Sequence, residues 1–338
     1  MRRGKLAAAA VGLVALAAAA PATALLPRGT VRFTDLPVVT LPIAAPNLVP
    51  EEPAPERGLA RLASPEPDPG RGPPIAIDPQ LVETTTLGML PRVDAEGRTP
   101  LAHYARPAAR DCRRPCVAVL VTGLGLADRL TERALALPGE VGLSFSPYAE
   151  AAAWQARARA AGHETMLGLP LEPERFPLDD TGPLTIRAAA PPDARAAAVL
   201  RVLAQGSGYV ALESAAGAFA ADRAAFAPLA ARLHERGLGL IEFGGDELAA
   251  SARVAGLAYA GGAVEIDRDP APAAIEQALA EVVAAARAQG RAMAVAEPLP
   301  ASLDRIAAWI AGLPGEGVAL VPPSVLLSGE AGAIAGRD

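Results

Sequence analysis

The chain has 338 residues, of which 51% are hydrophobic and 20% are charged, and its formal net charge is −6 with a pI near 5.3. This composition excludes wholesale disorder, and only one long apolar stretch occurs, which excludes a polytopic membrane protein. The acidic balance argues against a nucleic-acid-binding surface, because phosphate neutralisation needs clustered cations.

The N-terminus has a basic start followed by an apolar run. Arg2 and Arg3 precede an apolar stretch over residues 6–20, and small residues follow at 22–24. This is the three-part pattern of a secretory signal, although an uncleaved Ala-rich helix would serve as a membrane anchor. We therefore expect a signal peptide or membrane anchor over residues 1–26. The protein is then exported, and is either periplasmic or anchored in the membrane facing the periplasm.

Proline is concentrated in the next part of the chain. About half of the 34 prolines lie between Pro21 and Pro107, and clusters of proline with Glu or Asp cannot bury enough apolar surface to fold alone. We expect a Pro-rich disordered linker over residues 27–110, one folded domain over 111–328 and a flexible tail over 329–338.

The two cysteines, Cys112 and Cys116, lie where this domain begins. An oxidising compartment favours a disulfide between them, and a turn through the three intervening residues would bring their Cα atoms within ~6 Å. We expect a small Cys112–Cys116 bridge before the first strand. Two unpaired thiols are the alternative.

From Cys116 onward, short apolar runs alternate with alanine-rich amphipathic stretches. The expected strands are 117–121, 141–145, 165–169, 209–212, 238–243, 263–266, 292–296 and 318–321. The expected helices are 127–137, 149–161, 193–204, 222–236, 247–255, 273–289 and 302–311. Seven or eight buried strands with intervening helices predict a parallel sheet, most economically closed as a β/α barrel. An open doubly wound sheet is the alternative.

In both architectures, function lies where strands end and loops begin. The polar residues at those positions are Thr122, Ser144, Ser146, Glu172, Glu213, Ser214, Glu242, Asp267, Glu297 and Ser324. None is a histidine, and His103, His163 and His234 lack metal-ligand spacing. Four of the acids could converge on the rim, either as an all-oxygen site for Mg²⁺ or Ca²⁺ or as a carboxylate pair for glycoside cleavage; these are Glu213, Glu242, Asp267 and Glu297. Helix capping is the alternative for Glu242 and Asp267.

Several strand-end segments follow a recognisable order. The most specific reads Gly162-His163-Glu164-Thr165-Met166-Leu167-Gly168-Leu169-Pro170-Leu171-Glu172-Pro173, and shorter pieces occur at 121–125, 137–138, 146–149, 208–210, 266–267, 303–309 and 320–324. Together they resemble the divergent polysaccharide deacetylases, whose corresponding segment reads GHEvlLHLPMEP. The resemblance covers about residues 86–327 and implies a distorted β/α barrel.

In active members of that family, a divalent metal held by an Asp and two His removes acetyl groups from amino sugars. The residues that match the family's metal and catalytic positions here are Thr122, Gly123, Gly168, Glu213, Ser214 and Glu297. Glu172 and Asp267 match the residues of the family at their positions, and Glu242 occupies a position where the family usually has an Asp. Because neither histidine ligand remains, and a zinc site without imidazole or thiolate would be most unusual, we expect no metal and no cofactor.

Three hypotheses follow for the function. The first is a pseudoenzyme of cell-envelope carbohydrate metabolism that binds an envelope glycan or an envelope protein in the old groove, with substrate contacts from Thr122, Glu172 and Ser214. The second is an active carbohydrate hydrolase, a deacetylase or glycosidase, that uses the four rim acids. The third is a purely structural partner protein whose alanine-rich helices are the contact surface.

Overall fold

The computed structural model describes residues 72–73, 76–108 and 115–327. The expected signal or anchor (1–26), the tail (329–338) and Cys112 lie outside the described residues, as does the expected linker up to residue 71.

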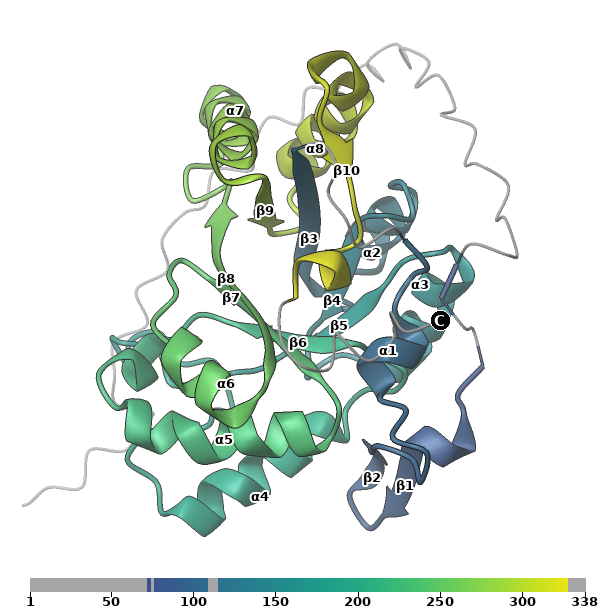
Figure 1. Cartoon of the computed structure of the whole chain (residues 1–338). Coiled ribbons are helices and arrows are strands. Elements are labelled where there is room, and N and C mark those ends of the chain that lie inside the picture. Colours follow the sequence, from purple (N-terminus) through teal and green to yellow (C-terminus); the bar gives the residue numbers. More distant parts are fainter. Residues whose placement is uncertain (1–71, 74–75, 109–114, 328–338) are drawn as a thin grey trace, which may run out of the picture. The chain divides into compact units, whose positions relative to one another are not determined.

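Within these residues, eight parallel strands form the central sheet (Figure 1). They are β3 (Cys116–Leu124), β4 (Gly142–Phe145), β5 (Thr165–Gly168), β6 (Ala211–Ser214), β7 (Gly239–Phe243), β8 (Ala258–Glu265), β9 (Arg291–Ala296) and β10 (Ala319–Leu320). Each strand from β3 to β8 pairs with the next, and β9 pairs back onto β3 from Cys116↔Arg291 to Val121↔Ala296. That last ladder closes seven strands into the predicted barrel and excludes the open sheet, while β10 pairs only with the start of β3.

The barrel is distorted between β8 and β9, which pair only at Val264↔Ala294 and Glu265↔Val295. The sequence predicted β8 over 263–266, but the strand begins earlier, at Ala258, because its first half forms a ladder with β7. Gly261 and Gly262 interrupt the apolar pattern there and disfavour a strand when read alone, so the local prediction was wrong.

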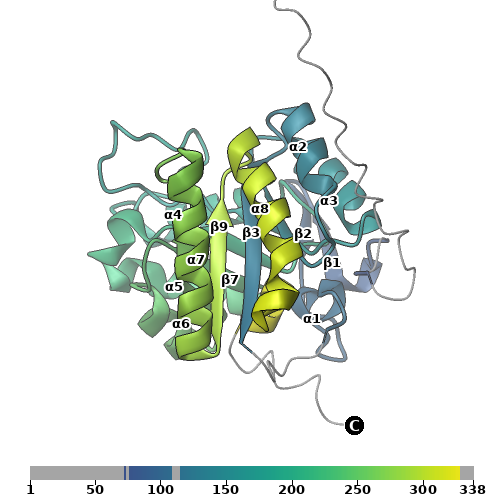
Figure 2. The same cartoon turned by 90° about the horizontal axis from the view of Figure 1, so that it is seen from above.

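Seven helices lie on the outer face of the barrel, close to their predicted ranges. They are α2 (Asp128–Leu135), α3 (Ala151–Ala160), α4 (Pro192–Leu203), α5 (Arg223–Glu235), α6 (Ala249–Ala255), α7 (Pro272–Gln289) and α8 (Pro300–Gly312). Figure 2 shows α7 and α8 side by side over β9 and β3. Gly290 ends α7 with φ +83°, the left-handed conformation that glycine adopts without steric cost.

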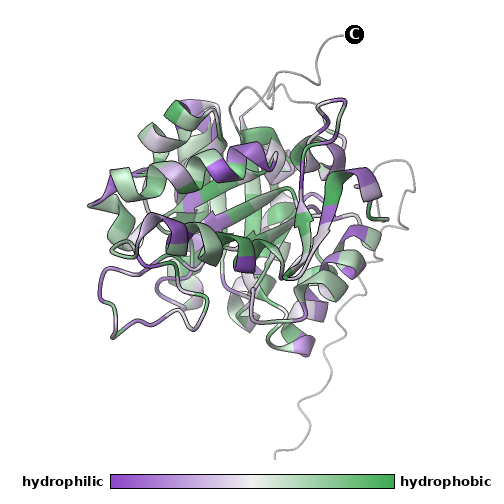
Figure 3. Cartoon of the chain, turned by 90° about the horizontal axis from the view of Figure 1, so that it is seen from below, coloured by the Kyte–Doolittle hydropathy of each residue, from purple (hydrophilic) through white to green (hydrophobic). Residues whose placement is uncertain are grey.

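Side-chain alternation along the strands builds two hydrophobic clusters. On β3, Val117, Val119 and Val121 pack with residues of the surrounding helices, whereas Ala118 and Leu120 belong to a second cluster that contains no residue of α2–α8. Successive strand residues point to opposite faces, so the second cluster fills the barrel interior. In Figure 3 the strands between the helices are mostly hydrophobic, and hydrophilic segments lie mainly on the surrounding helices and loops.

Two short helices close the amino-terminal end of the barrel. One is α1 (Pro100–Tyr104), whose Leu101 and Tyr104 join the interior cluster; the other is the 3-10 helix η5 (Pro323–Leu326). Glu164, just before β5, is fully buried and connects the segment after α1 to η5. Its carboxylate accepts hydrogen bonds from the backbone N–H of Arg106 (2.8 Å), from the backbone N–H of Ser324 (2.9 Å) and from the Ser324 hydroxyl. Burial raises the pKa of Glu164, and these donors offset part of that shift.

The linker predicted over 27–110 is too long at its C-terminal side, because residues 79–104 are folded. They form the 3-10 helix η2 (Pro79–Leu81), the antiparallel hairpin β1 (Val82–Thr85) and β2 (Gly88–Pro91), and α1. Glu83 ties the hairpin to α5 through an ion pair with Arg236 (2.8 Å). None of these elements is long enough to show a hydrophobic period, and they fold by packing on the barrel.

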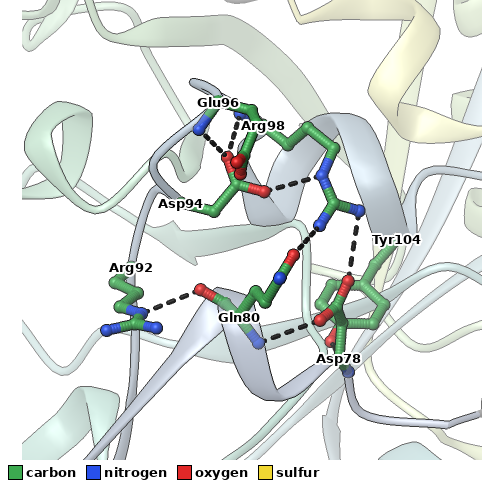
Figure 4. A network of polar contacts seen from close by, with 7 residues as sticks. All are labelled: Asp78, Gln80, Arg92, Asp94, Glu96, Arg98 and Tyr104. Carbon is green, nitrogen blue, oxygen red and sulfur yellow. Dashed lines mark hydrogen bonds and ion pairs between the residues drawn. The ribbon is translucent and has the colours of Figure 1, made fainter.

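A polar network centred on Arg98 orders this segment (Figure 4). The guanidinium pairs with Asp94 (Nε to Oδ2, 2.6 Å) and Asp78 (Nη1 to Oδ2, 3.1 Å) and donates to the side-chain oxygen of Gln80 (2.7 Å). The Tyr104 hydroxyl accepts the backbone N–H of Asp78 (2.9 Å), which connects η2 to α1. These bonds link stretches that look like linker in the sequence.

Across the part of the chain that the structure describes, no helix combines the length and the apolar character needed to cross a membrane.

Replacing Glu164 by alanine leaves three partly buried donors without an acceptor, so Glu164→Ala should lower the free energy of unfolding by about 2–4 kcal/mol. Urea denaturation measures this. The matched control is Glu140→Ala, since Glu140 also contacts Arg106 (3.3 Å) but is partly exposed; its effect should stay within about 0.5 kcal/mol. Equal losses of unfolding free energy in the two variants would show that the hydrogen bonds of Glu164 do not stabilise this end of the barrel.

Candidate functional site

A cavity of about 370 Å³ lies at the carboxyl ends of the barrel strands β3 to β7. Its lining comes from strand ends and from the loops that follow them: Gly123, Ser146, Pro147, Tyr148, Gly168, Leu169, Pro170, Leu171, Pro173, Thr181, Glu213, Ser214, Ala215, Gly217 and Phe243. This is the end of a parallel β/α barrel where active sites lie. The volume falls within the range of about 300–1,000 Å³ that is typical of ligand pockets.

Glu213, near the end of β6, supplies the cavity's carboxyl group. The side chain is only 7% exposed, and its Oε1 accepts a hydrogen bond from the hydroxyl of Ser144 on β4 (3.1 Å). Burial raises the pKa of Glu213 to about 7, and the Ser144 hydrogen bond opposes this rise. In the described residues, no other Asp or Glu and no Arg, Lys or His lines this cavity.

Gly168 lies directly beside Glu213 in the ladder between β5 and β6. A Cβ at position 168 would come within 3.3 Å of both Glu213 Oε1 and Pro147 Cδ, closer than most side-chain contacts. Glycine therefore keeps the space in front of the carboxyl open. The resemblance to the family predicts that this position corresponds to the histidine of the HLPME motif, and among the described lining residues no imidazole lies next to Glu213.

Aromatic rings and the loop after β5 form much of the remaining lining. The Tyr148 hydroxyl accepts the backbone N–H of Leu184 (3.1 Å), and a Cβ at Gly182 would lie 2.9 Å from the Tyr148 ring, so the loop packs on this ring. Sequence reasoning did not select Tyr148, Thr181 or Phe243 as site residues. Tyr148 could have been found, because it follows the strand-end residue Ser146 within a segment that resembles the family.

Glu172, an expected substrate-binding residue, does not line the cavity. Its carboxylate accepts hydrogen bonds from Arg187 Nε (2.9 Å) and the Ala188 N–H (2.8 Å), and its carbonyl oxygen accepts the Ala218 N–H (2.8 Å). The side chain thus ties together both ends of the loop after β5. It supports the cavity wall indirectly.

Of the other two expected substrate-binding residues, only Ser214 lies in the lining. Its hydroxyl donates to the carbonyl oxygen of Ala215 (2.8 Å). Thr122, outside the lining, donates to the carbonyl oxygen of Ala296 (3.3 Å) and thereby adds a hydrogen bond between β3 and the end of β9.

The four rim acids do not converge. In the ladder between β6 and β7, Glu213 is opposite Ile241 and Ser214 is opposite Glu242, so Glu213 and Glu242 point to opposite faces of the barrel wall. Glu242 is fully buried and accepts hydrogen bonds from the Glu247 and Leu248 N–H groups (3.0 Å each) and from the Tyr259 hydroxyl (2.6 Å). Burial raises the pKa of Glu242 to about 7.

Asp267 bonds to the backbone of Glu297 and to Ser302 rather than to Glu213. Asp267 Oδ2 accepts hydrogen bonds from the backbone N–H of Glu297 (2.9 Å) and the hydroxyl of Ser302 in the first turn of α8 (2.6 Å). Glu297 itself is exposed. Glu242 thus accepts N–H groups of the turn that leads into α6, and Asp267 accepts the Glu297 N–H and the Ser302 hydroxyl, so neither belongs to a shared acidic site.

The residues present do not fit the divalent metal that the family implies. Within the described ranges, no three His, Cys, Asp or Glu side chains are grouped so that they could hold a metal ion. The cavity offers one carboxylate together with hydroxyl and backbone groups, and it contains no imidazole. A divalent-metal site requires more strong donors than this set provides.

Cys116 is fully buried at the first residue of β3. Because Cys112 lies outside the described residues, the Cys112–Cys116 bridge stays a prediction.

Glu213 should make folding stability depend on pH. Its folded pKa, about 7, lies above the ordinary value of 4.5, so its stabilising contribution is complete below pH 4.5 and is lost as the pH rises through 7. The loss is on the order of 3 kcal/mol. Urea unfolding at pH 5, 6, 7 and 8 should show this decline, which Glu213→Gln should make shallower.

Ser144→Ala provides the comparison, because it removes the donor that favours the charged form of Glu213 and should move the decline to higher pH. If wild type and Glu213→Gln showed the same pH dependence, Glu213 would already be ionised throughout this range.

Comparisons with known proteins agree with this architecture. The crystal structure of the uncharacterized protein ATU2773 from Agrobacterium tumefaciens C58 is 31% identical, with a TM-score of 0.67 over 71% of this chain and 100% of that chain. The glycoside hydrolase domain of PelA from Pseudomonas aeruginosa is 19% identical and covers 64% of this chain and 98% of its own, but its TM-score of 0.34 is too low to extend the comparison. A search of curated proteins found no match.

The sequence profile of the divergent polysaccharide deacetylases matches residues 119–327, which include every strand of the barrel from within β3 to β10 and the whole cavity lining. The chain therefore belongs to the divergent polysaccharide deacetylase family.

Proposed function

We propose that the barrel domain binds a glycan in the cavity at the carboxyl ends of its strands, and that it does so without the metal-dependent hydrolysis of its family. The observation that supports this proposal is the composition of the cavity. At the carboxyl ends of the barrel strands, its described lining has one carboxyl group and no set of metal ligands.

The lining suits a sugar. Tyr148 and Phe243 offer apolar ring faces, and Ser146, Thr181 and Glu213 offer oxygen atoms that can hydrogen-bond hydroxyl groups. A mostly apolar cavity with a few polar groups is the usual form of a small-molecule site. Tyrosine combines an apolar face with a hydroxyl, which suits a ligand that has C–H faces and O–H edges.

The hydrolase alternative receives no comparable support. A glycosidase needs two carboxyl groups about 5–9.5 Å apart across the scissile bond, whereas Glu213 is the single Asp or Glu among the described lining residues. The alternative of a purely structural partner protein leaves the cavity without a role.

The cell-envelope setting is part of the proposal. It rests on the pattern of residues 1–26, which predicts export to the periplasm with or without a membrane anchor. We propose an envelope glycan as the partner, with an envelope protein as the alternative.

The test uses the full chain, purified without chelator. Metal analysis and thermal shifts with Zn²⁺, Mg²⁺, Mn²⁺ and Ca²⁺ should find no stoichiometric metal and no stabilisation at micromolar concentrations. Calorimetry with oligomers of glucosamine and N-acetylglucosamine should detect binding of at least one of them, and mass spectrometry should detect no loss of acetyl groups. One equivalent of metal together with acetate release would instead establish a deacetylase.

Tyr148→Ala should weaken glycan binding about tenfold, because it removes the aromatic wall of the cavity. The matched control is Leu178→Ala: Leu178 lies in the loop after β5, is 83% exposed and does not line the cavity. Equal affinities of both variants and wild type would place the glycan elsewhere.

A further inference from the structure

We infer that the cavity selects a glycan unit with a free primary ammonium group, as in a deacetylated amino sugar, and that Glu213 is the counterion of that group. The inference rests on the glycan-binding function proposed above and specifies the chemical class of the ligand.

The first observation is the unused hydrogen-bonding capacity of Glu213. A carboxylate accepts about four hydrogen bonds, yet the single bond to this side chain in the described structure is that from Ser144 Oγ to Oε1. Oε2 has no protein donor although the side chain is 93% buried, as its 7% exposure shows. Oε2 is not one of the fully buried side-chain atoms without a partner, so it retains accessible surface at the cavity that Glu213 lines, where a ligand can hydrogen-bond to it.

The second observation is the missing countercharge. No arginine, lysine or histidine lies among the described lining residues, and Tyr148 is the other titratable group there. On the neighbouring strands, β4 contributes Ser144 and β5 contributes Gly168. Glu242 of β7 points to the opposite face, where its oxygens accept other hydrogen bonds. An ammonium group on the ligand would supply the absent positive charge inside a poorly solvated site.

The third observation is the open space around Glu213. Three lining residues are glycines: Gly123, Gly168 and Gly217. A Cβ at Gly123 would meet nothing within 4 Å, and a Cβ at Gly168 would lie 3.3 Å from both Glu213 Oε1 and Pro147 Cδ, whereas a Cβ at Gly217 would collide with the carbonyl oxygen of Glu172. A ligand group can therefore approach the carboxylate. An acetylated nitrogen is neutral and bulkier, so it would fill the space and leave the charge of Glu213 uncompensated.

The experiment measures the affinity of the full wild-type chain at pH 7 for tetramers of glucosamine and of N-acetylglucosamine by calorimetry. The glucosamine tetramer should bind at least tenfold more tightly. Glu213→Gln should abolish this preference by lowering the affinity for the glucosamine tetramer to that for the acetylated tetramer, because glutamine keeps the size of the side chain but not its charge.

Glu297→Gln is the matched control, since it removes one negative charge at an exposed strand end outside the cavity and should keep the preference. Equal wild-type affinities for the two tetramers, or a preference that Glu213→Gln leaves unchanged, would overturn the inference while glycan binding stands. If Glu297→Gln also lost the preference for the glucosamine tetramer, the preference would depend on overall charge, and the inference would be overturned too. Absence of binding by either tetramer would overturn the proposed function itself. The wild-type comparison decides the matter even if a variant fails to fold.

Discussion

A closed parallel barrel gives every strand residue one of two environments, the interior or the layer beneath the helices, and the rest of this structure depends on that constraint. The ladder between β3 and β9 closes the ring. The register between β6 and β7 then sends Glu213 inward at the cavity and sends Glu242, opposite Ser214, to the other face. Two carboxyl groups that both lie at strand ends therefore have different roles. One lines the cavity, and the other accepts the N–H groups of the turn that leads into α6.

The two ends of the barrel also differ in what fills them. At the amino-terminal end, segments far apart in the chain, around α1 and η5, insert apolar side chains into the interior, and Glu164 joins them through three hydrogen bonds. At the carboxyl-terminal end, glycines and apolar residues with a few polar side chains line a cavity instead. The packed end provides stability and the open end provides a place for a ligand, which is the division of roles expected of a β/α barrel.

Membership in the divergent polysaccharide deacetylases does not by itself determine the chemistry of the site, because function depends on the particular side chains present there. Gly168, which the resemblance aligns with the histidine of the HLPME motif, lies beside Glu213, and no cationic side chain is among the described lining residues. The described residues therefore group no set of metal ligands and place one poorly solvated carboxyl group at the cavity. Such a site can bind and discriminate by charge and shape, which supports the proposal of a glycan-binding protein that prefers amine-bearing sugar units.

The sequence by itself determined the barrel, its seven outer helices and most of its strands, because buried parallel strands and amphipathic helices have hydrophobic periods that can be read locally. It also placed Glu213 and Ser214 at strand ends next to the site. Only the tertiary structure decided which strand-end acids meet, since strand register is not encoded in any one segment. It also decided that residues 79–104 are folded and that β8 begins at Ala258. These short or glycine-containing elements are stabilised by contacts with distant parts of the chain, which a local pattern cannot contain.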